Sequence, residues 1–201
     1  MIKNLVFDLG QVMVRFDPDY MVSAHTESPE DRRLLAPIIF DRLYWDPLDA
    51  GTISDEEVVR AVKSRIPERL HEVAERIYYD WIYNIPEIEG MCELVRYVKE
   101  RYGVRIFLLS NVCTYFAEHE NEIPCLSLFE KRIYSGVCGF VKPERGIFEH
   151  LCRECGILPE ETFFIDDNEK NIRGAAEYGI NGYLFDGDSK KLREYIDNLL
   201  G

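Results

Sequence analysis

Five short apolar runs are spaced along the chain, and polar residues follow each of them. They cover residues 5–7, 104–109, 133–135, 162–165 and 183–185. Segments in which apolar residues recur with helical periodicity separate the runs. This alternation predicts strands of a parallel sheet with helices on both faces. The sequence therefore predicts an α/β fold with a doubly wound, Rossmann-like parallel sheet.

The stretch between the first two predicted strands is unusually long. About ninety residues lie there, far more than one crossover helix requires. Helical patterns occupy it: one helix opens at Ser28, and Ser54 with Glu57 forms a capping box before another. We predict a small helical cap domain over residues 17–86, and a core domain made of residues 1–16 and 87–201.

Four short motifs stand at or near the ends of the apolar runs. They are Phe-Asp-Leu-Gly at 7–10, Leu-Leu-Ser-Asn at 108–111, Lys-Pro at 142–143 and Phe-Ile-Asp-Asp at 164–167. Open α/β sheets bind ligands beside the carboxyl ends of their strands. We therefore expect one site built from four distant segments, with carboxylates, a hydroxyl group and a lysine. These groups suit phosphate chemistry.

Each motif offers a chemical role and an ordinary structural one. Asp8 follows a strand expected at the centre of the sheet, where its carboxylate can attack phosphorus, or it can simply cap a turn. Lys142, held in place by Pro143, can neutralise charge on a phosphoryl group. Ser110 and the backbone at Asn111 can bind phosphate oxygens, although such residues are also common in turns.

The adjacent carboxylates of Asp166 and Asp167 indicate a cation. Their mutual repulsion needs compensation by a metal ion, a lysine or both. Hard oxygen ligands favour Mg²⁺, and the four histidines are too scattered for an evident zinc cluster. We expect Asp166 to contact the metal. Asp167 either supports the site or caps the helix that begins near Glu169.

The four motifs, in this order and with a helical insert after the first, resemble the haloacid dehalogenase-like hydrolase superfamily. The likeness covers essentially the whole chain and is to the phosphatase-rich group with a helical cap at the first insertion point. It implies that Asp8 is the nucleophile and a Mg²⁺ ligand, and that Asp166 completes the metal site. It also implies that Ser110 holds the phosphate and that Lys142 stabilises the phosphoryl group.

Gly10 departs from the pattern of these phosphatases. They usually carry a second aspartate two residues after the nucleophile, which protonates the leaving group and then activates water. A general acid contributes about 10² to 10⁴-fold in rate. In the family this residue also gives its backbone carbonyl to Mg²⁺, and glycine retains a carbonyl. Gly10 is therefore an expected metal ligand without the proton donor.

Three functions compete at this point. The first is a phosphatase whose substrate has a good leaving group, such as a sugar 1-phosphate. The chain is similar to the bacterial branch that contains α-D-glucose-1-phosphate phosphatases. That branch also carries Asp-Leu-Gly at the nucleophile motif, and residues 49–54 of this chain fit the sequence pattern of its cap. The second is a 2-haloacid dehalogenase, since a halide needs no proton, but the Asp166-Asp167 pair opposes it. The third is a catalytically weak phosphate-binding or regulatory protein.

Substrate choice is expected to lie in the cap, which closes over the site. The candidates are Tyr44, Trp45, Asp46 and Asp49, in a loop between the first two cap helices. Two more are Arg15 and Asp17, on the flap, which is the segment between the first strand motif and the cap helices. Aromatic rings beside carboxylates can stack on a sugar and accept hydrogen bonds from its hydroxyls. Tyr44 and Trp45 fit the interior of the cap equally well.

The charge composition limits the kinds of partner that the protein can bind. Lysine and arginine number 24 against 37 acidic residues, and the formal net charge is -13. This charge argues against nucleic acid or an anionic membrane surface and favours a small phosphorylated metabolite as partner. The apolar runs are too short to span a bilayer, and we expect a cytoplasmic monomer or weak dimer. The six cysteines are expected to be reduced thiols.

Overall fold

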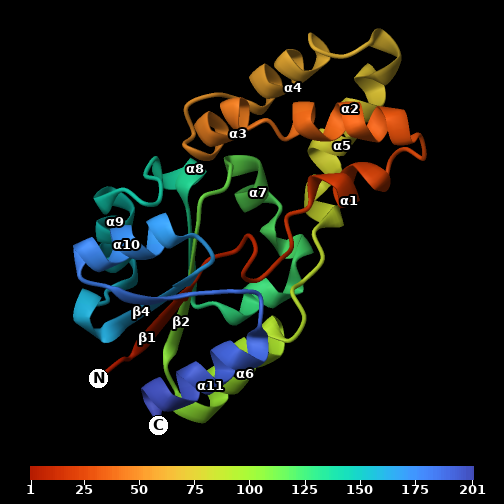
Figure 1. Cartoon of the computed structure of the whole chain (residues 1–201). Helices are drawn as coiled ribbons and strands as arrows, with labels where there is room; N and C mark the ends of the chain where they lie inside the picture. Colours follow the sequence, from red (N-terminus) through yellow and green to blue (C-terminus); the bar gives the residue numbers. More distant parts are fainter.

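Five parallel strands form one sheet in the order β3-β2-β1-β4-β5, in a computed structural model that describes all residues 1–201 (Figure 1). The strands are β1 Asn4–Phe7, β2 Arg105–Ser110, β3 Lys131–Tyr134, β4 Thr162–Asp166 and β5 Asn181–Leu184. The predicted α/β fold is confirmed. The edge strands β3 and β5 begin two residues before their apolar runs, because their first residues are polar or glycine.

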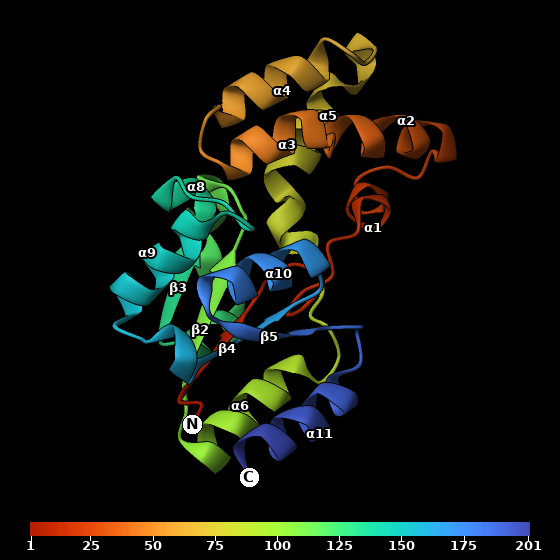
Figure 2. The ribbon, with the colours of Figure 1, turned by 60° about the vertical axis from the view of Figure 1, so that its left-hand side comes forward.

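Helices cover both faces of the sheet. They are α6 Met91–Tyr102, α7 Thr114–Glu118, α8 Ser135–Cys138, α9 Arg145–Cys155, α10 Glu169–Tyr178 and α11 Ser189–Leu200. Helices α6 and α11 lie on one face, and α9 and α10 lie on the other (Figure 2). Alternate residues of β1 serve the two faces: Leu5 and Phe7 pack on the side of α6, and Val6 packs on the side of α9. Residues 5–7 of the central strand are therefore all apolar.

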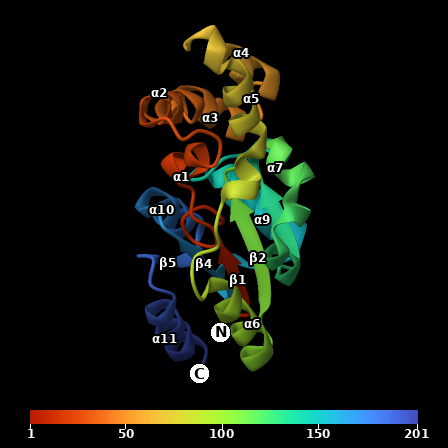
Figure 3. The same ribbon diagram turned by 90° about the vertical axis from the view of Figure 1, so that its right-hand side faces the viewer.

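Five helices lie beyond the carboxyl ends of the strands (Figures 1 and 3). These cap helices are α1 Pro18–Ser23, α2 Pro29–Ile39, α3 Arg42–Asp49, α4 Asp55–Lys63 and α5 His71–Asp80. Ser28 caps α2, and the capping box of Ser54 and Glu57 opens α4 as predicted. The domain boundary at 17–86 remains a prediction, because one hydrophobic cluster continues from the sheet into these helices.

The segment expected to be a loop between cap helices is helix α3. Asp41 accepts a hydrogen bond from the backbone N–H of Leu43 at 3.0 Å and so starts the helix. Trp45, Leu48 and Asp49 are buried on its inner side, which is the spacing of a helix. Pro47 lies inside the helix, and a proline in that position favours a loop when only the sequence is considered.

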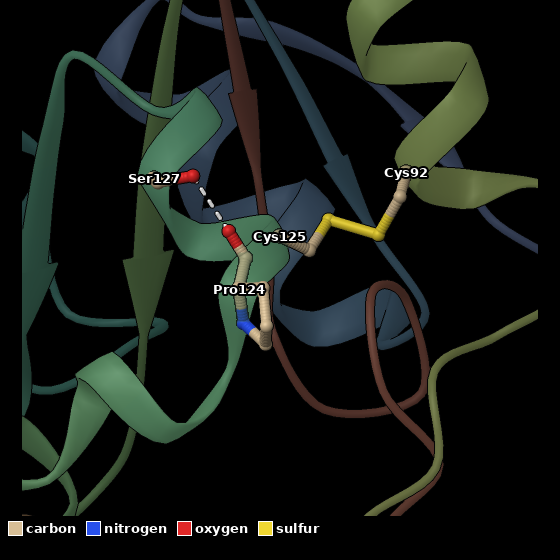
Figure 4. Close-up of a disulfide and its surroundings, with 4 residues drawn as sticks. All are labelled: Cys92, Pro124, Cys125 and Ser127. Atoms are coloured by element: carbon tan, nitrogen blue, oxygen red, sulfur yellow. Dashed lines mark hydrogen bonds between the residues drawn. A yellow bond between two sulfur atoms is a disulfide. The ribbon is translucent and has the colours of Figure 1, made fainter.

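A disulfide joins Cys92 of α6 to Cys125 (Figure 4). The expectation of six reduced thiols was wrong for this pair. Helix α6 packs against the short 3₁₀ turn Pro124–Leu128, which brings the two Cα atoms within 5.8 Å despite a sequence separation of 33. The sequence alone gives no sign of this contact. Cys113, Cys138, Cys152 and Cys155 are free thiols.

A helix that crosses a membrane must be long and apolar, and no helix of this structure meets both conditions.

Candidate active site

The polar residues at the strand ends converge because the strands are in register. In β1, Phe7 pairs with Leu108 of β2 and with Ile165 of β4. Asp8 and Asp166 therefore leave the sheet side by side, and the Asp8 backbone N–H donates to the Ile165 carbonyl at 2.9 Å. Asp8, Asp166 and Ser110 of β2 are all buried. The strand order places them at one edge of the sheet, as the motifs predicted.

Lys142 lies at the centre of this group. Its Nζ is 2.7 Å from Oδ1 of Asp8 and 2.8 Å from Oδ2 of Asp166, and it donates to the Leu109 carbonyl at 3.0 Å. Burial disfavours the ammonium charge, but Asp8 and Asp166 outweigh burial and raise the pKa of Lys142. The ammonium therefore stays protonated, with all three of its donors used inside the protein.

Asn111 holds the loop that carries Lys142. Its side-chain oxygen accepts from the Lys142 backbone N–H at 2.8 Å, and its Nδ2 donates to the Lys142 carbonyl at 2.9 Å. Helix α10 closes on the same loop, since a Cβ at Gly174 would lie 2.3 Å from the Pro143 carbonyl oxygen. The Asn111 side chain thus positions Lys142. Its backbone was the part expected to bind phosphate.

Asn171 was missed by the sequence reasoning. Its Nδ2 lies 3.0 Å from Oδ1 and 3.1 Å from Oδ2 of Asp166, and the backbone N–H of Asn168 also donates to Oδ1 at 2.8 Å. The available signal was its place in the first turn of the helix after Asp166. These contacts fix the orientation of the Asp166 carboxylate.

The carboxyl groups of Asp8, Asp166 and Asp167 fit a divalent cation. One oxygen from each lies within 4.8 Å of the others. Burial is the largest influence on Asp8 and, with the charge of Asp166, raises its pKa to about 7 even though Lys142 opposes the shift. Burial and Asp166 also raise the pKa of Asp167. One ammonium cannot balance three carboxylates, and hard oxygen donors suit Mg²⁺.

Asp167 does not cap the following helix, which corrects one of the two expectations for it. Asn168 is the N-cap of α10, and its side chain accepts from the backbone N–H of Lys170 at 3.0 Å. Asp167 instead lines the cavity above the sheet. Its carboxylate is therefore free to support a cation site.

A cavity of about 610 Å³ lies between the strand ends and the cap helices. Of the residues expected to form the site, it is lined by Asp8, Gly10, Ser110, Asn111, Lys142, Asp167, Trp45, Asp46 and Asp49. Sequence reasoning did not find the lining residues Gln11, Phe16, Arg42, Trp81, Lys170 and Asn171. Arg42 opens α3, the segment that was expected to be a loop, and no sequence motif marked it.

Three candidates for substrate choice lie outside this cavity. Arg15 is exposed, and Asp17 caps α1 by accepting from the Tyr20 backbone N–H at 3.1 Å. Tyr44 faces Arg65, whose guanidinium carbon is 5.7 Å from the ring centre. The helical course of α3 explains the difference, because it turns Tyr44 away from the side that carries Trp45 and Asp49.

Trp45 belongs mainly to the interior of the cap. It is 4% exposed, its ring centre lies 5.2–5.5 Å from those of Phe40, Phe16 and Trp81, and its Nε1–H donates to the Ile39 carbonyl at 2.6 Å. Only part of the ring reaches the cavity. Of its two expected roles, packing is therefore the dominant one.

Comparison with known proteins identifies the family of this chain. A model described as haloacid dehalogenase-like hydrolase matches residues 2–179. A D-ribitol-5-phosphate phosphatase from Bacteroides thetaiotaomicron is 26% identical over 197 residues, which cover 91% of each chain. The drimenol cyclase drtB of Aspergillus calidoustus is 23% identical over 203 residues, and this chain spans only 37% of that protein's length.

A similar solved structure contains the expected metal. It is the magnesium complex of a HAD family enzyme from Bacteroides thetaiotaomicron, with a TM-score of 0.68 and 26% sequence identity. The match covers 90% of this chain and 92% of that one. The likeness therefore extends over both the sheet and the cap helices.

Proposed function

Because the chain belongs to the haloacid dehalogenase-like hydrolase family, as its motifs predicted, we propose that it is a Mg²⁺-dependent phosphatase of small phosphorylated metabolites. The observation that carries the proposal is the buried group of Asp8, Lys142 and Asp166, of which Asp8 and Lys142 line a cavity large enough for a small molecule. The related phosphatase and the related magnesium complex support it.

In this proposal Asp8 is the nucleophile. Lys142 holds Oδ1 of Asp8 at 2.7 Å, which leaves Oδ2 to attack phosphorus and form an aspartyl-phosphate. The Lys142 ammonium offsets charge that develops on the phosphoryl group. The Ser110 hydroxyl and the backbone at Asn111 bind phosphate oxygens.

Asp8, Asp166 and the Gly10 carbonyl would hold Mg²⁺, which would offset phosphate charge and orient the phosphoryl group. Asn171 keeps the Asp166 carboxylate in one orientation, and Asp167 adds negative charge beside the site. Because Lys142 already occupies one oxygen of each ligand carboxylate, it limits where a cation can approach.

We propose a sugar or polyol phosphate, such as glucose 1-phosphate, as the substrate. The cavity carries Asp46 and Asp49 from the cap, whose carboxyl groups can hydrogen-bond hydroxyls, and the cation Arg42 beside them. The related Bacteroides enzyme acts on D-ribitol 5-phosphate. These features favour a polar, hydroxyl-rich substrate over an apolar one.

The test is phosphate release from a panel that includes α-D-glucose 1-phosphate, glucose 6-phosphate, D-ribitol 5-phosphate and p-nitrophenyl phosphate. Each is assayed with Mg²⁺ and with chelator, and Asp8→Asn serves as the blank. We expect turnover that needs Mg²⁺ and disappears in the variant. No turnover by the folded protein on any of them would refute the proposal and favour a phosphate-binding protein. Halide release from a 2-haloacid with chelator present would instead favour a dehalogenase.

A further inference from the structure

Asp49 is a buried carboxyl group that the proposed reaction has so far not used. It ends helix α3, is 9% exposed and lines the same cavity as Asp8. Its Oδ1 is buried and has no hydrogen-bond partner. Buried polar atoms are almost always paired within a folded protein. Asp49 lines the cavity, and one oxygen of its carboxyl group has no partner inside the protein, so contacts within the fold do not account for this carboxyl group.

The core of the protein fixes the position of Asp49. The Ser135 hydroxyl donates to the Asp49 carbonyl at 2.5 Å and accepts from the Val112 backbone N–H at 2.9 Å. Ser135 is fully buried at the start of α8. The cap residue Asp49 is thus attached to the backbone that follows Ser110 at the end of β2.

The turn after α3 presses closely on the core. A Cβ at Gly51 would lie 2.7 Å from the Gly136 carbonyl oxygen, and a Cβ at Gly136 would lie 2.8 Å from the Thr114 backbone nitrogen. Gly51 also has a φ of 70°, which favours glycine. Two glycines therefore permit an approach that side chains would prevent. These contacts hold the end of α3, and with it Asp49, against the core.

The surroundings of Asp49 keep its proton in place at neutral pH. Burial is the main cause and raises its pKa to about 8. The negative charges of Asp46, on the same helix, and of Asp8 raise the pKa further. Arg42 lowers it, but the Arg42 guanidinium also forms an ion pair with Asp46, in which Nε lies 2.9 Å from Oδ1. The thiol of Cys113, on the turn after β2, is also near and is neutral because burial raises its pKa to about 12.

We propose that Asp49 is the general acid of the reaction and supplies the proton that an aspartate at position 10 would otherwise give. This inference rests on the proposed phosphatase function. It would allow the chain to cleave esters with poor leaving groups although position 10 is glycine. The proton donor comes from a cap helix, whose end is attached to the core.

The proton and electron balance of the two steps is simple. In the first, an oxygen of Asp8 bonds to phosphorus while the bond from phosphorus to the leaving oxygen breaks, and that oxygen takes the Asp49 proton and departs as an alcohol. In the second, the Asp49 carboxylate takes a proton from water as the water oxygen bonds to phosphorus. The bond from phosphorus to Asp8 breaks, its electron pair returns to the carboxylate, and phosphate leaves.

The decisive experiment compares leaving groups in Asp49→Asn, a change that keeps the shape of the side chain. The exposed Glu56 of α4, outside the cavity, provides Glu56→Gln as the matched control. The substrates are ribitol 5-phosphate, whose alkoxide must be protonated, and p-nitrophenyl phosphate, whose leaving group needs no proton. We expect Asp49→Asn to lower kcat for ribitol 5-phosphate by about 10² to 10⁴-fold and to change kcat for the aryl ester far less.

Two further results complete the test. The fall in kcat for the alkyl ester above about pH 8 should be lost in Asp49→Asn. Adding Gly10→Asp to this variant should restore much of the rate, since no atom lies within 4 Å of a Cβ at Gly10. Equal losses on both esters, or a change in KM alone, would overturn the role of Asp49. Inactivity of the unaltered protein on both esters would instead refute the phosphatase function itself.

Discussion

Removing the Lys142 ammonium should destabilise the protein strongly when no divalent cation is present. Lys142 is 4% exposed and lies 2.7 and 2.8 Å from two buried carboxylates. Lys142→Met keeps an unbranched side chain that is one atom shorter, and it leaves both carboxylates without their common partner. Breaking a buried ion pair by removing one member costs about 3–5 kcal/mol. For a chain of this size, that loss lowers Tm by roughly 6–20 °C.

The assay is urea unfolding of the two proteins in chelator, followed by circular dichroism. Lys170→Met is the control, because Lys170 lines the same cavity but is exposed, and surface changes of this kind stay within about 0.5 kcal/mol. A loss below about 1 kcal/mol for Lys142→Met would refute the reasoning, since it would mean that the carboxylates do not depend on the lysine.

Magnesium should reverse part of this loss. A ligand at 100 times its Kd stabilises the folded state by about 2.7 kcal/mol. In Lys142→Met the cation no longer competes with an ammonium for Asp8 and Asp166, so we expect the variant to gain more from Mg²⁺ than the unaltered protein gains. An equal gain in both proteins would place the metal away from these two carboxylates.

Three other changes test separate parts of the structure. Trp45→Ala should cost about 3–5 kcal/mol of unfolding free energy and should raise KM for sugar and aryl phosphates alike. A rise in KM for the sugar phosphate alone would show direct stacking on the substrate. Asn171→Ala should weaken Mg²⁺ binding about 10 to 100-fold in calorimetry, because it frees the Asp166 carboxylate; unchanged affinity would contradict its positioning role. Burial raises the pKa of Asp49 in the folded protein to about 8, whereas the unfolded chain loses this proton near pH 4, so this group makes the unaltered protein less stable as pH rises between about pH 4 and 8. Asp49→Asn has no such proton, and its free energy of unfolding should therefore rise relative to that of the unaltered protein by up to about 1.4 kcal/mol per pH unit in this range. A difference in urea unfolding that stays constant with pH would contradict this.

The sequence predicted the sheet and the meeting of its motifs because both follow from local rules. An apolar run that ends in a polar residue marks the carboxyl end of a buried strand, and parallel strands bring such ends together. Asp8, Ser110 and Asp166 needed no further information. Lys142 was recoverable as well, although its hydrogen bonds to both carboxylates depend on the loop held by Asn111.

What the sequence did not reveal depends on contacts between distant segments. The segment of helix α3 was predicted to be a loop, but packing holds it as a helix even though Pro47 is a poor residue for a helix interior. Cys92 and Cys125 meet only because α6 packs on a turn near residue 125. The position of Asp49 depends on the contact between cap and core through Ser135, which no local pattern records.

The most direct test of the central claim is to trap the phosphate on Asp8. The protein is mixed with ribitol 5-phosphate or p-nitrophenyl phosphate and Mg²⁺, quenched in acid during turnover, digested and mapped by mass spectrometry. We expect phosphate on the N-terminal peptide at Asp8, sensitive to hydroxylamine and absent from Asp8→Asn, with more of it in Asp49→Asn on the aryl ester because water activation is slowed. Turnover without any phosphate on Asp8, or with phosphate on another residue, would contradict the account.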